Sequence, residues 1–453
     1  MHNKPSIWLD DDGAALFTDL YELTMLQAYW RKEMHDNAVF SLFVRDLPEH
    51  RNYMLFAGLE SVLRYLETVR FTDEALDYLK TQDEFQDGFL DWLSNFRFTG
   101  DVYAMVEGTP FFAEEPVIEV EAPVSQAQLF ETFIMNQVHH QTLAATKASR
   151  VVNAAGKDRA VVDFGLRRMH GADAGVKSAR SFHIAGAKAT SNVYGGFVYG
   201  VPISGTMAHS YVQAHDDELE AFRSFAQVYP DTILLVDTYD TLEGVKLVIE
   251  LARELGDDFK ISGIRLDSGD LEKLAFDSRE MLDDAGLNDV NIFASSSLDE
   301  YKIAKMVKNG APIDGFGVGT HMGVSDDSPY LDMVYKLVLF AGEGRLKTSP
   351  GKGTLPGRKQ VFRQEEGGKA ARDVIAGADE RHDGRKLLRK VMDRGERLPE
   401  AAEDIEQARE TAEREMDMLP ENLLALEKAD PPYEVRVSDE LRRRKEAAVR
   451  RIT

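Results

Sequence analysis

Several short segments of the sequence place residues suited to phosphate chemistry directly after apolar runs. They are Phe164-Gly165-Leu166-Arg167-Arg168, Gly205-Thr206-Met207-Ala208-His209, Arg265-Leu266-Asp267-Ser268-Gly269-Asp270, Ser295-Ser296-Ser297 and Gly317-Val318-Gly319-Thr320-His321. Arginine binds phosphate in a bidentate fork, and aspartate accepts ribose hydroxyls or binds hydrated Mg²⁺. Glycine-rich turns present backbone N–H groups to anions. Together these residue types predict a site for a phosphorylated ligand.

His209 is the candidate for group transfer. It follows the apolar residues 199–203, and we expect residues 199–204 to form a buried strand. Imidazole carries protons or a phosphoryl group near neutral pH. Each feature also has a structural alternative: a buried, satisfied histidine for His209, an internal salt bridge for Arg265 and Asp267, and a tight glycine loop for residues 317–320. The adjacent arginines at 167 and 168 favour an anion, because two arginines on a buried turn would be costly without one.

Composition limits the class of protein. The chain has 453 residues, no cysteine and a formal net charge of −24. Without cysteine there can be no disulfide framework, thiolate zinc site or cysteine nucleophile. The acidic surface disfavours nucleic acids and anionic lipids as partners. We see no signal peptide and no membrane-length apolar run, so we expect a soluble, cytoplasmic protein.

The elements that must position these residues fall into three predicted domains. Residues 1–150 mix helices with a small sheet, residues 151–330 alternate strands and helices, and residues 331–453 return as strands followed by charged helices. Serial strand–helix units predict a parallel α/β barrel that carries the active site, with an open doubly wound sheet as the alternative. In a barrel, the polar turns after the strands meet at one mouth.

The sequence also resembles a known family. The segments Thr18-Asp19-Leu20-Tyr21-Glu22-Leu23-Thr24-Met25, Phe164-Gly165-Leu166-Arg167-Arg168, Thr190-Ser191-Asn192-Val193, Gly205-Thr206-Met207-Ala208-His209-Ser210 and Arg265-Leu266-Asp267-Ser268-Gly269-Asp270 closely resemble nicotinate phosphoribosyltransferase, in order, over roughly residues 16–357. The resemblance implies an irregular parallel α/β barrel and a mixed α+β N-terminal domain completed by C-terminal strands. It also implies a homodimer with shared active sites. The implied reaction belongs to NAD biosynthesis and forms nicotinate mononucleotide and pyrophosphate from nicotinate and phosphoribosyl pyrophosphate.

The resemblance also assigns roles to individual residues. Nicotinate would contact Tyr21 of the partner subunit, Phe164, Arg167, Ser191, Thr206 and Arg265; phosphoribosyl pyrophosphate would contact Arg265, Asp267, Gly319 and Thr320. His209 matches the residue that the family phosphorylates with ATP, which places the enzyme with the ligases, and Mg²⁺ is the expected cofactor. The sequence identifies no metal ligands.

Two departures from the family pattern bear on specificity. The position of Ser191 is acidic in the nicotinamide-using relative, so a serine favours nicotinate, whose carboxylate an acid would repel. The segment Ser295-Ser296-Ser297 lacks the Asn or Asp expected to hold the ribose. The alternatives are a nicotinamide phosphoribosyltransferase of the same fold and a catalytically silent metabolite-binding dimer. A barrel aldolase or isomerase would need a lysine at a strand end, and these segments contain none.

Overall fold

The chain forms two compact units. The computed structural model describes residues 9–348, 353–402 and 404–452. One unit comprises the residues up to Leu143 together with those from Tyr330 onward, and the other comprises Ala144–Pro329. Helix α6 (Glu131–Ala155) leads from the first unit into the second. The three-domain division with limits after residues 150 and 330 stays a prediction.

The first unit is built on a seven-stranded antiparallel sheet in the order β13-β12-β1-β5-β3-β17-β18. Its strands are β1 (Asn37–Val44), β3 (Asp101–Ala104), β5 (Ile118–Pro123), β12 (Met333–Phe340), β13 (Glu343–Gly344), β17 (Arg389–Asp393) and β18 (Glu396–Arg397). The returning strand β12 pairs with β1, and β17 pairs with β3. This pairing confirms that C-terminal strands complete the N-terminal sheet.

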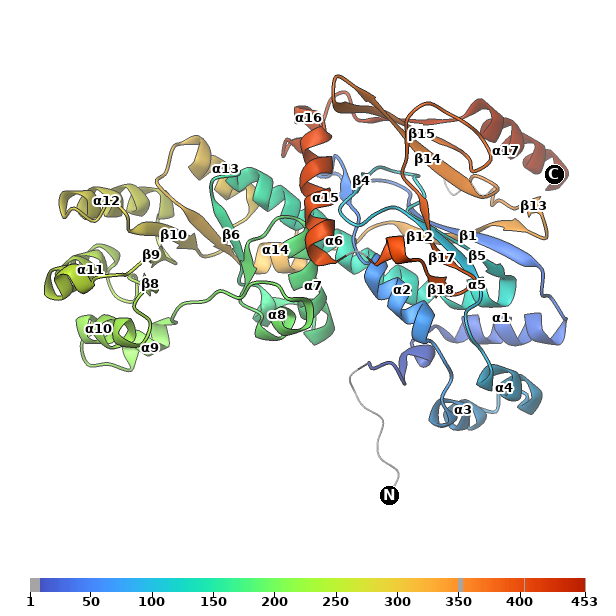
Figure 1. The fold of residues 1–453 in the computed structure, drawn as a ribbon, viewed down its shortest axis with the longest axis horizontal. Helices are drawn as coiled ribbons and strands as arrows, with labels where there is room; N and C mark the ends of the chain where they lie inside the picture. The colour runs from blue at the N-terminus through green and yellow to red at the C-terminus, as the bar shows by residue number, and fades with distance from the viewer. Residues whose placement is uncertain (1–8, 349–352, 403, 453) are drawn as a thin grey trace. The chain divides into compact units, whose positions relative to one another are not determined.

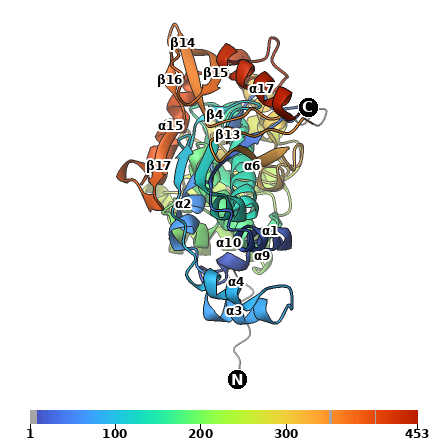
Figure 2. The same ribbon diagram turned by 90° about the vertical axis from the view of Figure 1, so that its right-hand side faces the viewer.

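Helices and two smaller sheets complete the first unit. The helices are α1 (Leu20–Arg31), α2 (Leu59–Thr68), α3 (Asp73–Lys80), α4 (Asp87–Ser94), α5 (Val124–Leu129), α15 (Ile405–Met418), α16 (Glu421–Leu424) and α17 (Asp439–Ile452). The smaller sheets contain β16 (Arg385–Lys386), β14 (Lys359–Glu366), β15 (Lys369–Gly377) and β19 (Glu434–Val437), and then β2 (Met54–Leu55) with β4 (Pro110–Phe111). Figure 2 shows α17 beside β15, which it contacts.

The second unit is a parallel six-stranded sheet in the order β7-β6-β11-β10-β9-β8. Figure 1 labels its strands β6, β8, β9 and β10. The strands are β6 (Ala160–Asp163), β7 (Ala189–Thr190), β8 (Ile233–Leu235), β9 (Gly263–Leu266), β10 (Asn291–Ser295) and β11 (Gly315–Val318). The helices are α7 (Ala172–Ile184), α8 (Val193–Tyr199), α9 (His209–Gln213), α10 (Glu218–Val228), α11 (Thr241–Leu255), α12 (Leu271–Asp284), α13 (Glu300–Lys308) and α14 (Thr320–Val324). The predicted α/β class and parallel barrel strands are confirmed, with the sheet curled as a half-barrel.

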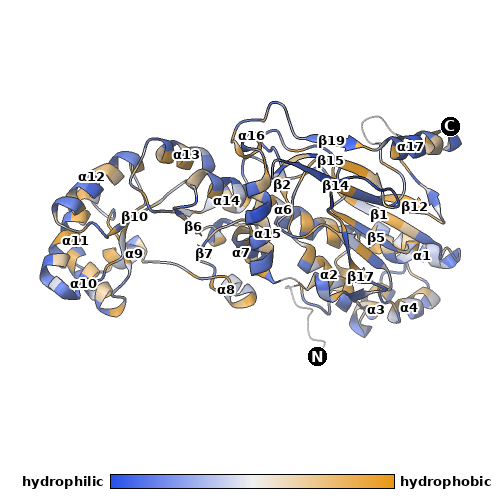
Figure 3. Ribbon diagram, turned by 45° about the horizontal axis from the view of Figure 1, so that its top comes forward, coloured by the Kyte–Doolittle hydropathy of each residue, from blue (hydrophilic) through white to orange (hydrophobic). Residues whose placement is uncertain are grey.

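Local sequence explains where these helices begin. Asp217, Asp240, Asp270 and Asp299 cap α10, α11, α12 and α13, each accepting a hydrogen bond from a backbone N–H in the first turn. Such a cap stabilises a helix by about 1 kcal/mol. Figure 3 shows that α10, α11 and α12 each have a hydrophobic and a hydrophilic side. Amphipathic helices of this kind bury their apolar side against a sheet.

The strand predicted over residues 199–204 is wrong. Helix α8 ends at Tyr199, and Gly200 adopts a left-handed φ of 73° at its C-cap. Pro202 has no N–H to donate to a ladder. In the described chain this segment keeps a single parallel bridge, between Thr190 and Ile203, and no ladder joins β7 to β8. The sheet is therefore open at this point, and His209 begins a helix instead of following a strand.

Candidate functional site

The predicted site residues of the second unit lie at the carboxyl edge of the parallel sheet. Asp163, the last residue of β6, is in register with Val318, the last residue of β11. On β9, Arg265 is in register with Leu235, the last residue of β8. The turns that follow these strands therefore leave the sheet at one edge, where ligands bind in parallel α/β proteins.

His209 lies among polar groups from two strand ends. It is the first residue of α9, and its side chain is 39% exposed. Its Nδ1 is 3.2 Å from Thr238 Oγ1, and its Nε2 is 3.6 Å from Asp267 Oδ2. Each ring nitrogen thus faces a different oxygen. The partly exposed ring contradicts the alternative of a buried core histidine.

Thr238 is a contact that the sequence analysis missed. It belongs to the turn Asp237-Thr238-Tyr239-Asp240, which follows β8. This turn has the same pattern of an apolar run followed by polar residues as the segments singled out from the sequence. That pattern is the signal that could have found it.

Arg265 connects the aromatic part of the site to the segment before His209. Its Nη2 donates a hydrogen bond of 2.8 Å to the carbonyl oxygen of Met207. Its guanidinium carbon lies 5.8 Å from the centre of the Phe164 ring. Burial lowers the pKa of Arg265, and the nearby Asp267 and Asp237 oppose this shift. In the described residues Arg265 donates to a carbonyl instead of forming the internal salt bridge with Asp267 that was the alternative.

A carboxylate network holds Asp267. Asp237 Oδ2 accepts hydrogen bonds of 2.8 Å from the backbone N–H of Asp267 and 2.6 Å from the hydroxyl of Ser268. Ser295 donates its hydroxyl to Asp267 Oδ1, so the serine segment does reach this carboxylate. Asp237 Oδ1 is buried and has no hydrogen-bond partner among the residues that the structure describes. Asp237 is therefore a second residue of the site that the sequence analysis missed.

The remaining predicted residues of this unit line the same edge. Ser191 follows β7, and its N–H donates to the Asp163 carbonyl oxygen at 2.8 Å. Thr206 is half-buried, Gly319 precedes α14, and Thr320 is the first residue of that helix. Arg167 lies in a 3-10 helix, Leu166–Arg168, whose residues are all exposed.

The prediction of a buried arginine turn is therefore wrong. Both arginines of Leu166–Arg168 are exposed. Neither residue needs a bound anion to offset burial, because water solvates both side chains. The exposed position still leaves Arg167 near Arg265, whose pKa it lowers.

Tyr21 belongs to the other compact unit. It lies on α1 and is 48% exposed. Burial of part of its ring and a hydrogen bond to Glu22 raise the pKa of its hydroxyl. The structure of this single chain therefore groups Phe164, Arg265, Asp267 and His209 in one unit and leaves Tyr21 in the first.

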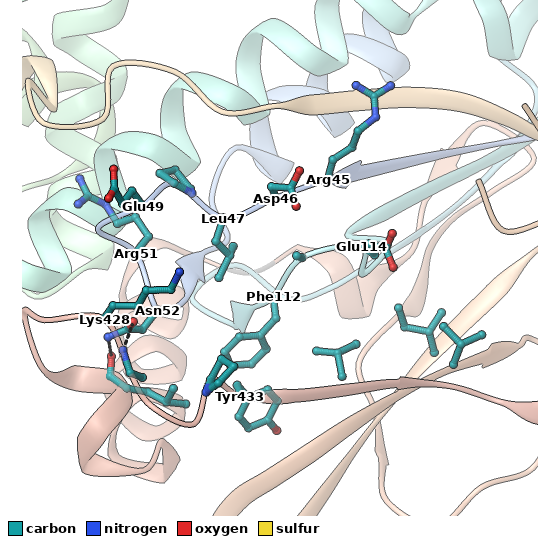
Figure 4. A pocket seen from close by; sticks show the side chains of 18 residues that line it. Arg45, Asp46, Leu47, Glu49, Arg51, Asn52, Phe112, Glu114, Lys428 and Tyr433 are labelled. Atoms are coloured by element: carbon teal, nitrogen blue, oxygen red, sulfur yellow. Dashed lines mark hydrogen bonds between the residues drawn. The ribbon is translucent and has the colours of Figure 1, made fainter. Parts of the chain in front are cut away.

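A cavity of about 420 Å³ lies within the first unit (Figure 4). Its wall includes the stacked rings of Phe112 and Tyr433, whose centres are 3.8 Å apart. The amide of Asn52, also on the wall, donates to the carbonyl oxygens of Leu423, Ala425 and Glu427. None of the residues predicted to bind substrate lines this cavity.

Comparison with known sequences gives a consistent result along the chain. Residues 16–139 match the nicotinate phosphoribosyltransferase (NAPRTase) N-terminal domain, and residues 159–338 match the nicotinate phosphoribosyltransferase (NAPRTase) family. A nicotinate phosphoribosyltransferase of Mycobacterium tuberculosis is 51% identical over 427 residues, covering 94% of this chain and 92% of that protein. One from Bacillus subtilis is 44% identical over 389 residues, covering 84% of this chain and 79% of that protein.

Solved structures share the fold. The human nicotinic acid phosphoribosyltransferase has a TM-score of 0.84 at 26% identity, covering 95% of this chain and 99% of the human chain. A nicotinate-nucleotide pyrophosphorylase from Pyrococcus furiosus has a TM-score of 0.75 at 26% identity, covering 92% of this chain and 99% of that chain. The chain belongs to the nicotinate phosphoribosyltransferase family.

Proposed function

We propose that this protein joins nicotinate to phosphoribosyl pyrophosphate, forming nicotinate mononucleotide and pyrophosphate in NAD biosynthesis. The observation that carries the proposal is the grouping of Phe164, Arg265, Asp267 and His209 at one edge of the parallel sheet. The relatives named above are described by the same activity. Nicotinamide phosphoribosyltransferase is the alternative, and Ser191 favours nicotinate because it places no negative charge beside the base.

The aromatic part of the site suits a flat anionic base. Phe164 offers a face for offset stacking with the pyridine ring, and Arg265 lies near that face. Tyr21 of the partner subunit supplies the second face, and its half-exposed ring is accessible for this. The cationic side chains of Arg167 and Arg265 attract the carboxylate of nicotinate. Thr206 and Ser191 border the same slot.

The polar part of the site suits the sugar phosphate. When the bond from ribose C1 to pyrophosphate breaks, positive charge develops on the sugar and negative charge on the leaving group. Asp267 accepts hydrogen bonds from ribose hydroxyls and stabilises the sugar cation, while Arg265 stabilises the leaving group. Gly319 and Thr320 offer backbone N–H groups and a hydroxyl to the 5-phosphate.

The residues present fit Mg²⁺ held together with substrate phosphates. Asp237 Oδ1 is buried and has no hydrogen-bond partner within the described ranges of the chain. Asp267 is its neighbour, because the backbone N–H of Asp267 donates to Asp237 Oδ2. Among the described residues no group of three or more acidic, histidine or cysteine side chains could hold a metal alone. Magnesium sites that use one or two carboxylates plus phosphate oxygens have this character. When bound, Mg²⁺ would neutralise charge on the pyrophosphate.

His209 is the residue that couples ATP hydrolysis to this reaction. Its imidazole attacks the γ-phosphorus of ATP, ADP leaves, and the phosphoryl group is later transferred to water. The partly exposed ring, with Thr238 at one nitrogen and Asp267 at the other, leaves room for such a group. This coupling would place the enzyme with the ligases.

A homodimer completes the site. Helix α8 and the following segment expose several large apolar side chains: Val193 is 67% exposed, Tyr194 62%, Phe197 83% and Ile203 59%. An apolar patch of this kind on a monomer marks an interaction surface. A second copy of the chain is the occupant that also brings Tyr21 to the base.

In the described chain no helix is long and apolar enough to cross a membrane, and a cytoplasmic location stays a prediction.

One assay tests the proposal. Wild type and His209→Ala are incubated with phosphoribosyl pyrophosphate and either nicotinate or nicotinamide, with and without ATP and Mg²⁺. We expect nicotinate mononucleotide from the wild type, ATP stimulation in the wild type, and a weak ATP-independent rate in the variant. A clear preference for nicotinamide would contradict the substrate. Ligand binding without turnover would identify the silent dimer. Equal ATP stimulation in both proteins would remove His209 from the mechanism.

A further inference from the structure

Asp163 is a buried carboxylate beside the slot proposed for the base. It ends strand β6 and is 0% exposed. Its Oδ1 accepts the N–H of Gly165 at 2.7 Å, and its Oδ2 accepts the hydroxyl of Thr190 at 2.7 Å. Burial raises the pKa of Asp163, and these two hydrogen bonds oppose the shift. Burying a carboxylate costs free energy, and hydrogen bonds from donors to both of its oxygens offset part of that cost. Asp163 therefore holds its two donors in fixed positions.

The two hydrogen bonds join the two segments expected to flank nicotinate. The bond to Gly165 fixes the turn that carries Phe164 and leads to Arg167. The bond to Thr190 fixes the segment that carries Ser191. Thr190 Oγ1 also accepts the N–H of Asn192 at 3.1 Å, so this hydroxyl fixes the residue before Ser191 and the residue after it.

Neighbouring contacts leave these segments little other freedom. A Cβ on Gly317 would lie 2.4 Å from the Phe164 ring, so the ring packs directly on the backbone of β11. Thr190 exchanges backbone hydrogen bonds of 2.9 Å with Pro202 and Ser204, which lead to Thr206. The position of the Thr190 segment therefore also bears on the segment before His209.

We infer that Asp163 and Thr190 are positioning residues whose hydrogen bond sets the spacing between Phe164 and Ser191, and with it the affinity and selectivity for the base. The inference rests on the proposed function, because it presumes that nicotinate occupies the slot. Neither side chain need touch the substrate. Misplaced walls weaken the contacts to the base equally in the bound substrate and in the transition state, so the loss is expected in the KM for the base and not in kcat.

Thr190→Val tests this inference. Valine keeps the shape of threonine but neither donates to Asp163 nor accepts from Asn192. We expect the KM for nicotinate to rise about tenfold or more, the kcat and the KM for phosphoribosyl pyrophosphate to change less than about threefold, and the preference over nicotinamide to fall. Thr190→Ser keeps the hydroxyl and should restore most of the affinity.

Two further measurements separate positioning from loss of stability. Amide hydrogen exchange of the free protein should increase in Thr190→Val both near residues 163–168 and near 190–192, because one carboxylate holds both. Thr142→Val is the matched control: Thr142 is also buried and bonds to the backbone of Ala57 in the other unit. It should lower stability without changing the KM for nicotinate.

Each outcome decides. An active wild type with a folded Thr190→Val whose nicotinate KM is unchanged overturns this inference alone. Faster exchange confined to residues 190–192 overturns it as well. If Thr190→Val does not fold, Thr190→Ala replaces it, since alanine also lacks the hydroxyl that bonds to Asp163 and is smaller than threonine; an unchanged KM there has the same meaning. A wild type without activity overturns the proposed function and this inference with it.

Discussion

Thr238 Oγ1 lies 3.2 Å from Nδ1 of His209, so the imidazole is held by the turn that follows the neighbouring strand β8. The contact fixes the orientation of the ring, because the other nitrogen then faces Asp267 at 3.6 Å. A histidine that accepts and releases a phosphoryl group needs such an orientation. Thr238 therefore supports the proposed ATP-coupled step by orienting the ring of His209.

Thr238→Val should reduce the stimulation of nicotinate mononucleotide formation by ATP about fivefold, since one hydrogen bond contributes about 1 kcal/mol. The rate without ATP should change little, because that rate does not use the phosphorylated ring. Steady-state assays with and without ATP measure both quantities. Thr238→Ser retains the hydroxyl and should behave like the wild type. Full ATP stimulation in the valine variant would show that the contact has no part in the coupling.

Glu22→Gln should stabilise the protein at neutral and alkaline pH. Glu22 is fully buried, one of its oxygens has no hydrogen-bond partner in the described part of the chain, and burial raises its pKa to about 7. The native state therefore retains a proton that the unfolded state releases between pH 4.5 and 7. The free energy of unfolding then falls as pH rises through this window and is level above it.

Glutamine removes this dependence. We expect the difference in unfolding free energy between Glu22→Gln and wild type to be small near pH 4.5 and to reach about 1–3 kcal/mol above pH 7. Chemical denaturation at a series of pH values measures it. Glu84→Gln, at an exposed position, controls for the loss of one negative charge. A difference that is constant with pH would contradict the raised pKa.

Asn52→Ala should loosen the C-terminal segment of the first unit. The Asn52 amide donates to three carbonyl oxygens between residues 423 and 427, and its oxygen accepts the N–H of Ala429. Losing these bonds should lower the unfolding free energy by about 2–4 kcal/mol. Thermal unfolding and limited proteolysis near residues 423–429 measure the effect. Asn95→Ala, at an exposed helix end, is the matched control and should change stability by well under 1 kcal/mol.

Features that depend on neighbouring residues in the sequence were predicted, whereas contacts between residues far apart in the sequence were not. The turns after β6, β9 and β11 were found because an apolar run followed by polar residues is a local pattern. The segment 199–204 is as apolar as the strands that were predicted correctly, but Gly200 ends helix α8 there and Pro202 lacks the N–H for a strand hydrogen bond, so it forms a single bridge instead of a strand. Contacts such as Asp237 with Asp267 join residues 30 positions apart, and no local pattern specifies them.

Ser296→Gly should stabilise the turn that follows β10. Ser296 has a φ of 99°, a backbone conformation that side-chain-bearing residues rarely adopt and glycine adopts without strain. Because Ser296 is exposed, glycine removes no buried contact. We expect the unfolding free energy to rise by about 1 kcal/mol, and denaturant melts measure it. Ser94→Gly, at the end of helix α4, is the control and should instead lower stability, since Ser94 donates its hydroxyl to the Asp91 carbonyl oxygen. A loss of stability in Ser296→Gly similar to that of the control would show that the turn does not hold Ser296 in a strained conformation.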